Sequence, residues 1–162
     1  FFKIANGRAE IVPLVETAEA LQILPQIINQ FPLQKIHIGL NDLHLDLKLK
    51  FMFQVMSEGL LEIPCSILRK GGIEFGIGGL ARVGEGLVIP ELLIGEHVRL
   101  GSSSTILSRT FCRNPELSEG EFSLEVRRLS EIYNKFIKCG EDKLEQNRIK
   151  TWAKIQEVIS SM

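Results

Sequence analysis

Residues 35–40 read Lys-Ile-His-Ile-Gly-Leu, a short apolar run that stops at Asn41-Asp42. A run of this length with turn-forming residues behind it is typical of a buried strand. Three further runs of the same kind predict strands at 10–15, 73–79 and 104–109. Between these runs, hydrophobic residues recur at helical spacing and predict helices at 17–31, 63–70 and 90–100. Strands that alternate with helices indicate an α/β fold with a parallel sheet covered by helices.

Prolines and glycines mark the limits of these predicted helices. Pro25 lies inside the first helix and should kink it or start a second one. Pro64 and Pro90 fall in first turns, where a missing N–H costs little. Residues 43–53 alternate polar and apolar before becoming apolar, and we expect a loop with a short helix there.

The sequence pattern changes after Asn114-Pro115, where the alternation of short apolar runs and helices stops. The sequence 118–121, Ser-Glu-Gly-Glu, fits a capping box, and two long amphipathic helices should follow it. We therefore divide the chain into four βα units at 1–114 and a helical extension at 115–162.

Composition excludes several classes of protein. The 162 residues include 19 basic and 20 acidic side chains, with 44% apolar and 24% charged residues. This balance is that of a globular chain rather than a disordered one, and it indicates no nucleic-acid or polybasic membrane surface. No apolar run reaches the roughly 20 residues needed to cross a bilayer.

The cysteines Cys65, Cys112 and Cys139 are odd in number and widely spaced, without a CxxC or a Cys/His metal pattern. We expect three reduced thiols in a cytoplasmic protein. The chain does not begin with Met or with a recognisable signal peptide, and we expect it to be trimmed or part of a longer protein.

Polar residues follow each predicted strand, where parallel α/β folds bind ligands. They are Glu16 after the first strand, Asn41 and Asp42 after the second, and Arg82 and Arg109 after the third and fourth. Two carboxylates on neighbouring strands suit Mg²⁺ or Mn²⁺, which prefer oxygen ligands. Two arginines suit a carboxylate or phosphate.

Structural explanations remain open for the same residues. Glu16 and Asp42 could cap the helices that follow them, and the arginines could form ion pairs at the rim. The glycines around Gly78 match neither common phosphate-loop pattern, so close packing explains them as well as a ligand does. His44 is near enough to Asp42 in sequence to act as an acid or base. We expect His37 in the core.

Leu14-Val15-Glu16-Thr17-Ala18 followed by Gly39-Leu40-Asn41-Asp42-Leu43 resembles the HpcH/HpaI aldolase and citrate lyase family. The segments 75–82, 95–101 and 105–109 resemble a lyase-like subgroup, so the resemblance covers about residues 8–112. It implies that Glu16 and Asp42 bind Mg²⁺ or Mn²⁺. It also implies substrate contacts at Gly39, Asn41 and Gly78, and catalytic roles for Arg82, Arg109 and His44.

The resemblance implies a fold larger than this chain. Members of the family are (β/α)8 barrels, which need about 200–250 residues. The four strands here would be strands five to eight, with two helices after them. Leu14 stands where many of the aldolases have Gln, and the first half of the barrel supplies much of their site. We therefore expect a homo-oligomer, or pairing with a missing N-terminal half.

The implied function is that of a metal-dependent carbon–carbon lyase acting on a pyruvate-, oxaloacetate- or acyl-CoA-type substrate through an enolate. One alternative is a non-catalytic half-barrel that binds a small anion or a partner protein. Another is an open-sheet α/β module that binds a phosphate near residues 76–86.

Overall fold

A computed structural model describes residues 2–112 and 118–162 of the chain. Its centre is a parallel sheet of four strands in the order β1-β2-β3-β4. The strands span Leu14–Val15, Lys35–Ile38, Glu74–Leu80 and Ser104–Leu107. The predicted α/β fold with a parallel sheet in β-α alternation and C-terminal helices is confirmed.

The first strand is shorter than the predicted 10–15. Its pairing covers only Leu14 opposite His37 and Val15 opposite Ile38. Pro13 lies just before it, and its carbonyl still accepts a hydrogen bond of 2.9 Å from the His37 amide. Because proline has no N–H to give to a ladder, the regular strand begins after it.

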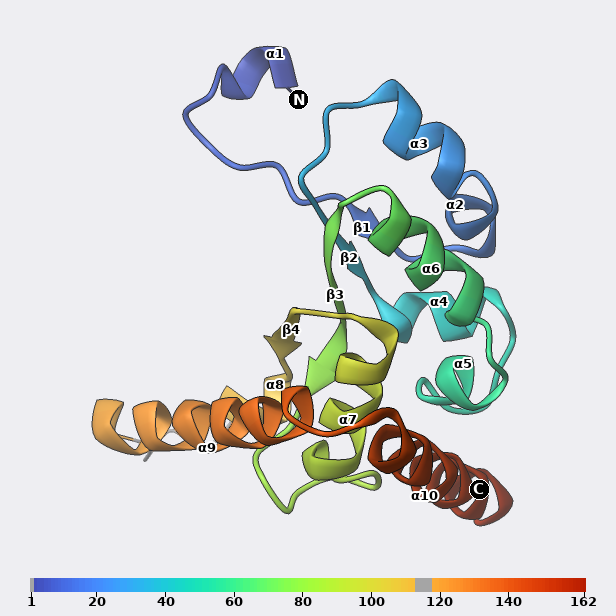
Figure 1. The fold of residues 1–162 in the computed structure, drawn as a ribbon, viewed down its shortest axis with the longest axis vertical. Coiled ribbons are helices and arrows are strands. Elements are labelled where there is room, and N and C mark those ends of the chain that lie inside the picture. The colour runs from blue at the N-terminus through green and yellow to red at the C-terminus, as the bar shows by residue number, and fades with distance from the viewer. Residues whose placement is uncertain (1, 113–117) are drawn as a thin grey trace.

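The helices that follow β1, β2 and β3 lie on the same side of the sheet (Figure 1). After β1 come α2 (Ala18–Gln22) and α3 (Leu24–Gln30), separated at Ile23 by the break that Pro25 predicted. After β2 come α4 (Leu40–Asp46), α5 (Gln54–Ser57) and α6 (Glu62–Lys70), and α7 (Pro90–Leu100) follows β3. Short helices lie at α1 (Phe2–Ala5) and α8 (Arg109–Cys112).

The start of α4 differs from our expectation. Asn41 and Asp42 do not end a strand in a loop but form the first turn of α4. Leu40 and Leu43 are both fully buried, and their spacing of three residues places them on one helix face. Burial of this apolar pair explains why the chain turns directly from strand into helix.

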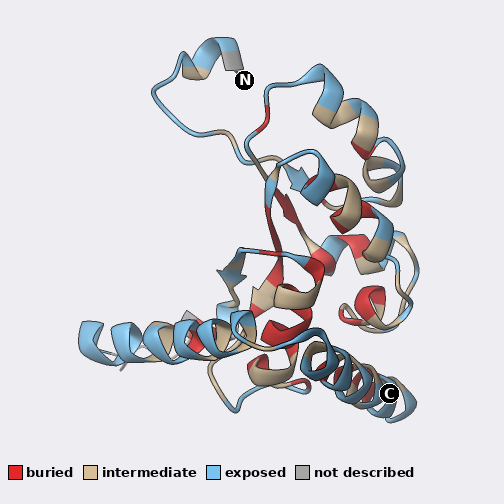
Figure 2. Cartoon of the chain, viewed as in Figure 1, coloured by how far each residue is buried: buried red, intermediate tan, exposed pale blue. Residues whose placement is uncertain are grey.

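The inner strands β2 and β3 are mostly buried and the outer strands β1 and β4 are more exposed (Figure 2), and the two faces of the sheet also differ. On the face under the helices, the side chains at 15, 36, 38, 75 and 77 are at most 2% exposed. On the other face, Leu14 at one edge is 54% exposed and Ile106 at the other edge is 52% exposed. Each new strand adds on the same side of the sheet. Because crossovers between parallel strands nearly always have the same hand, this order collects the helices on one face. The opposite face stays open at both edges.

The long C-terminal helices are α9 (Glu119–Ile137) and α10 (Glu141–Ser160). The capping box predicted at 118–121 is confirmed, because Ser118 accepts from the Glu121 amide and the Glu121 carboxylate accepts from the Ser118 amide. Both helices pack on α7, while the N-terminal part of α9 reaches out from the body (Figure 1).

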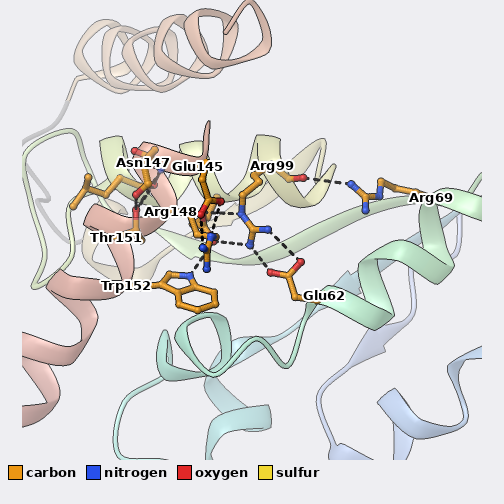
Figure 3. Close-up of polar contacts among 10 residues, drawn as sticks. Glu62, Arg69, Arg99, Glu145, Asn147, Arg148, Thr151 and Trp152 are labelled. Carbon is orange, nitrogen blue, oxygen red and sulfur yellow. Dashed lines mark hydrogen bonds and ion pairs between the residues drawn. The ribbon is translucent and has the colours of Figure 1, made fainter. Parts of the chain in front are cut away.

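A polar network anchors α10 on α7 and α6 (Figure 3). Glu96 is completely buried, and Arg99 donates to its two carboxylate oxygens at 3.0 and 2.9 Å. Arg99 also contacts Glu62 at 2.6 Å, and Trp152 Nε1 donates to Glu96 at 3.3 Å. Burial alone would lower the pKa of Arg99, but its hydrogen bonds to Glu96 and Glu62 raise it. The buried carboxylate is thus fully paired, as a charge in a dry interior must be.

Gly95 lets α10 approach α7 beside this network. A Cβ at position 95 would lie 2.1 Å from Asn147 Nδ2, and that nitrogen donates to the Leu92 carbonyl at 2.9 Å. The contact between the helices therefore depends on a residue without a side chain.

The structure describes the side chains of two of the three cysteines. Cys65 and Cys139 are free, and burial raises the pKa of the Cys65 thiol to about 12. The side chain of Cys112 and the boundary at 114–115 lie outside the described residues. Over the described residues, no helix is long and apolar enough to cross a membrane.

Candidate functional site

The ends of the strands surround a cavity of about 340 Å³. It collects six of the eight residues predicted for the site, from the segments after β1, β2 and β4 and from β3 itself. They are Glu16, Gly39, Asn41, Asp42, Gly78 and Arg109. The other two, Arg82 and His44, do not line it.

Glu16 lies directly against the end of β2. A Cβ at Gly39 would come within 2.4 Å of Glu16 Oε1, so the carboxylate occupies the space that any other residue at position 39 would fill. Glu16 does not cap the next helix, because Thr17 does so by accepting from the Ala20 amide at 3.1 Å. The structural explanation for Glu16 as a cap is therefore wrong.

Asp42 lies in the first turn of α4 and is exposed, and Asn41 precedes it on the same turn. Gly39 is the N-cap residue, so Asp42 is not the cap either. Within residues 2–112 and 118–162, neither the Glu16 nor the Asp42 carboxylate accepts a hydrogen bond or joins an ion pair. Both carboxylates are available to a ligand.

Arg109 supplies the positive charge of the cavity. It is exposed, it begins α8 directly after β4, and no described carboxylate pairs with it. An arginine held at the mouth of a cavity can bind a carboxylate through two parallel hydrogen bonds.

Arg82 lies elsewhere, at the junction with α9. Its Nε donates to the Phe111 carbonyl at 3.1 Å, and its Nη1 lies 3.9 Å from Glu85. The ion pair that we held open as the alternative is the arrangement the structure has. Arg82 connects the end of β3 to α8 rather than facing the cavity.

His44 also turns away from the cavity. Its Nδ1 lies 3.2 Å from the Leu40 carbonyl, one turn back in its own helix. The cavity contains a different histidine, His37, which is 6% exposed. Burial lowers the pKa of His37 against a smaller opposing effect of its hydrogen bond with the Gly78 backbone, so the ring is neutral at pH 7.

His37 is the site residue that sequence reasoning missed. We expected it in the core, and it is buried, but it also faces the ligand cavity. Its neighbours Ile36 and Ile38 point under the helices, so alternation places His37 on the open face. That alternation was visible in the sequence of the strand.

The described residues contain no group of three histidine, cysteine or acidic side chains placed to hold a metal. The pair Glu16 and Asp42 supplies two carboxylates, whereas zinc sites take three or four protein ligands. It is compatible with Mg²⁺, which often takes one or two carboxylates and keeps several waters.

The phosphate loop considered for residues 76–86 is not supported by the contacts of its later glycines. Gly84 and Gly86 lie outside the strand-end cavity, and the Gly84 amide already donates to Glu91 at 3.2 Å. That amide is therefore engaged by a carboxylate of the chain itself.

Comparison of the chain with protein-family models, with curated proteins and with solved structures found no match in any of the three. The fold and the cavity therefore carry the functional argument.

Proposed function

We propose that the strand-end cavity binds Mg²⁺ or Mn²⁺ and a small carboxylate substrate, as part of a metal-dependent carbon–carbon lyase of the HpcH/HpaI aldolase and citrate lyase type. The observation that carries the proposal is a single cavity with two carboxylates, Glu16 and Asp42, and one cation, Arg109, none of them paired within the described chain.

The donor set fits a hard divalent cation. Glu16 and Asp42 offer only oxygen atoms, and their cavity is open enough for water to complete six ligands. When bound, such a cation would supply Lewis-acid polarisation of a substrate carbonyl. With two carboxylates against the single positive charge of Arg109, the cavity carries a net negative charge, which also favours a cation on electrostatic grounds.

The chain's own residues would then hold the substrate. Arg109 would bind its carboxylate, and the Asn41 amide would hydrogen-bond to it. Gly39 and Gly78 have no side chains, so the substrate can approach the backbone there. Neutral His37, at the floor of the cavity, can accept a proton from a bound group or donate one to it.

We also propose that the sheet is half of a barrel, completed by a second half. In support, the strands follow one another across the sheet without reversal and their helices lie on one face. The open face exposes Leu14 and Ile106, and the outer edges of β1 and β4 have no strand beside them in the described chain. An apolar open face with free edges is a surface that proteins normally cover.

Sedimentation tests this association. We expect a dimer, and Leu14→Glu with Ile106→Glu should convert it to a monomer with unchanged circular dichroism. A wild-type chain that sediments as a monomer at all concentrations and keeps its secondary structure would contradict the pairing.

A second candidate is a non-catalytic module that binds a small carboxylate. The observation in its favour is that Arg82 and His44, two of the three catalytic candidates, lie outside the cavity. This candidate predicts metal and carboxylate binding without turnover.

Thermal unfolding with Mg²⁺ or Mn²⁺, with and without oxalate, tests the proposal. Oxalate is a flat dicarboxylate that can contact a cation and an arginine together. We expect the metal to raise Tm, and oxalate to raise it further only when the metal is present. Glu16→Gln and Asp42→Asn should abolish both effects, while the exposed Glu19→Gln on α2 should keep them.

Gly39→Ala tests the position of the Glu16 carboxylate more directly, because the atoms nearest to the added methyl group all belong to the Glu16 side chain, which must move. It should weaken metal binding with little loss of stability. Equal metal stabilisation in wild type, Glu16→Gln and Gly39→Ala would refute the metal site. Cleavage of oxaloacetate by the metal-loaded protein would then separate lyase from binding module.

A further inference from the structure

A second cavity, of about 330 Å³, lies between α7, β4 and α9. It shares no lining residue with the strand-end cavity. Its polar wall is formed by six uncharged side chains from these three elements: His97, Ser104, Thr105, Ser130, Tyr133 and Asn134. Leu80, Ile94 and Leu129 form the apolar part.

His97 is the central feature of this cavity. It is 4% exposed, and among the described residues it has no hydrogen-bond partner. Every described side-chain nitrogen or oxygen that is sealed from solvent does have a partner. The ring nitrogens of His97 are therefore not sealed off, and the ring lines this cavity. A ligand group that hydrogen-bonds to this ring would gain an interaction that no described residue supplies.

Three hydroxyl groups of the wall already donate their protons to backbone carbonyls. Tyr133 donates its proton to the Ser102 carbonyl at 3.3 Å, Thr105 donates to the Ile77 carbonyl at 3.2 Å, and Ser130 donates to the Val126 carbonyl at 3.0 Å. Because these protons are already used, the three oxygens are left as acceptors. A matching ligand needs several O–H or N–H donors.

The charge of the described lining residues restricts the class of ligand further. None of the described residues that line this cavity carries a charge, and burial lowers the pKa of His97 to about 4, with a smaller effect of nearby His37. The ring is neutral at pH 7, and a charged ligand would lose water without gaining an ionic partner.

The geometry points to a binding site for an uncharged, hydroxyl-rich molecule of monosaccharide size. The hydroxyls of the ligand would donate to Thr105, Ser130 and Tyr133, and His97 would bind one of them from the cavity floor. The leucine and isoleucine wall suits the C–H face of a sugar ring. This site is independent of the proposed metal site.

D-ribose is the first probe, and D-ribose 5-phosphate is the charged control. The full chain is titrated with each while the ring ¹⁵N resonances of His97 are followed by NMR. We expect ribose to shift the His97 resonances and to leave those of His44 in place. Absence of any His97 shift with ribose or glycerol up to about 10 mM would overturn the proposal. Tighter binding of the phosphate would overturn the assignment to an uncharged ligand.

Ser130→Phe tests the location without touching the core, because Ser130 is exposed on α9 at the cavity wall. It should weaken ribose binding by at least about tenfold. The matched control is Ser123→Phe, exposed on the same helix outside the cavity, which should bind as wild type does. Equal binding by the two variants would place the ligand elsewhere and overturn the site.

Discussion

Acidification from pH 7 to pH 4 should destabilise the protein through His97. Burial lowers the pKa of this ring from 6.5 to about 4 in the folded chain. In the unfolded chain the ring keeps its ordinary pKa of about 6.5. Between pH 6.5 and pH 4 the ring is protonated in the unfolded chain but neutral in the folded chain, so the free energy of unfolding falls as the pH falls.

The size of the effect follows from the shift. Each unit of pKa is worth about 1.4 kcal/mol, so the full effect is about 3 kcal/mol between pH 6.5 and pH 4. About 2 kcal/mol of it is lost by pH 5. His37, whose pKa is also lowered by burial, should add a loss of the same sign.

Urea unfolding of wild type and His97→Gln at a series of pH values measures the effect. Glutamine does not titrate, and its amide can serve the same cavity, so the variant keeps every other titrating group. The difference in unfolding free energy between the two proteins should be constant above pH 7. It should shrink by about 2 kcal/mol between pH 7 and pH 5. Parallel loss of stability in both proteins would refute the assignment of a buried, neutral His97.

Three further changes test the packing of the structure. Trp152→Phe removes a donor from the buried Glu96 carboxylate and should cost about 1–3 kcal/mol in urea unfolding, whereas an unchanged midpoint would mean that the carboxylate is not buried. Gly95→Ala forces α10 away from α7 and should also cost about 1–3 kcal/mol, and a neutral result would contradict their close contact. Cys139 should react with a thiol reagent in the folded protein while Cys65 is protected until unfolding, and equal rates would contradict the burial of Cys65.

Local sequence signals predicted the elements well where one short-range cause controls them. Pro25 broke its helix and the capping box at 118–121 started α9. Helix α7 begins and ends at the predicted residues, with Gly101 in the left-handed conformation at its end (φ 86°). Each of these signals acts within one helical turn, so a single sequence is enough to read it.

Signals that depend on tertiary contacts were harder to interpret. The buried pair Leu40 and Leu43 starts α4 directly after β2, whereas we expected the strand to stop at Asn41-Asp42 and a loop with a short helix to follow. In the Glu96 network, Arg99 pairs with Glu62, which is 37 positions away, and Trp152 pairs with Glu96, which is 56 positions away. No local sequence pattern predicts contacts over such separations.

The sequence predicted which residues lie at the ends of the strands, but it did not predict which way their side chains point. Glu16, Asp42 and Arg109 each follow a strand, and they line one cavity because parallel strands end at the same edge of the sheet. It could not show that Arg82 would turn toward Phe111, because that depends on a carbonyl 29 residues further along the chain.

Manganese binding tests the central claim most directly. Free Mn²⁺ is measured by electron paramagnetic resonance as it is added to wild type, Glu16→Gln, Asp42→Asn and the control Glu19→Gln. We predict one Mn²⁺ site in wild type and in Glu19→Gln, and its loss in the two cavity variants. Binding that is absent from wild type, or unchanged in Glu16→Gln and Asp42→Asn, would contradict the proposal that this cavity is a metal centre.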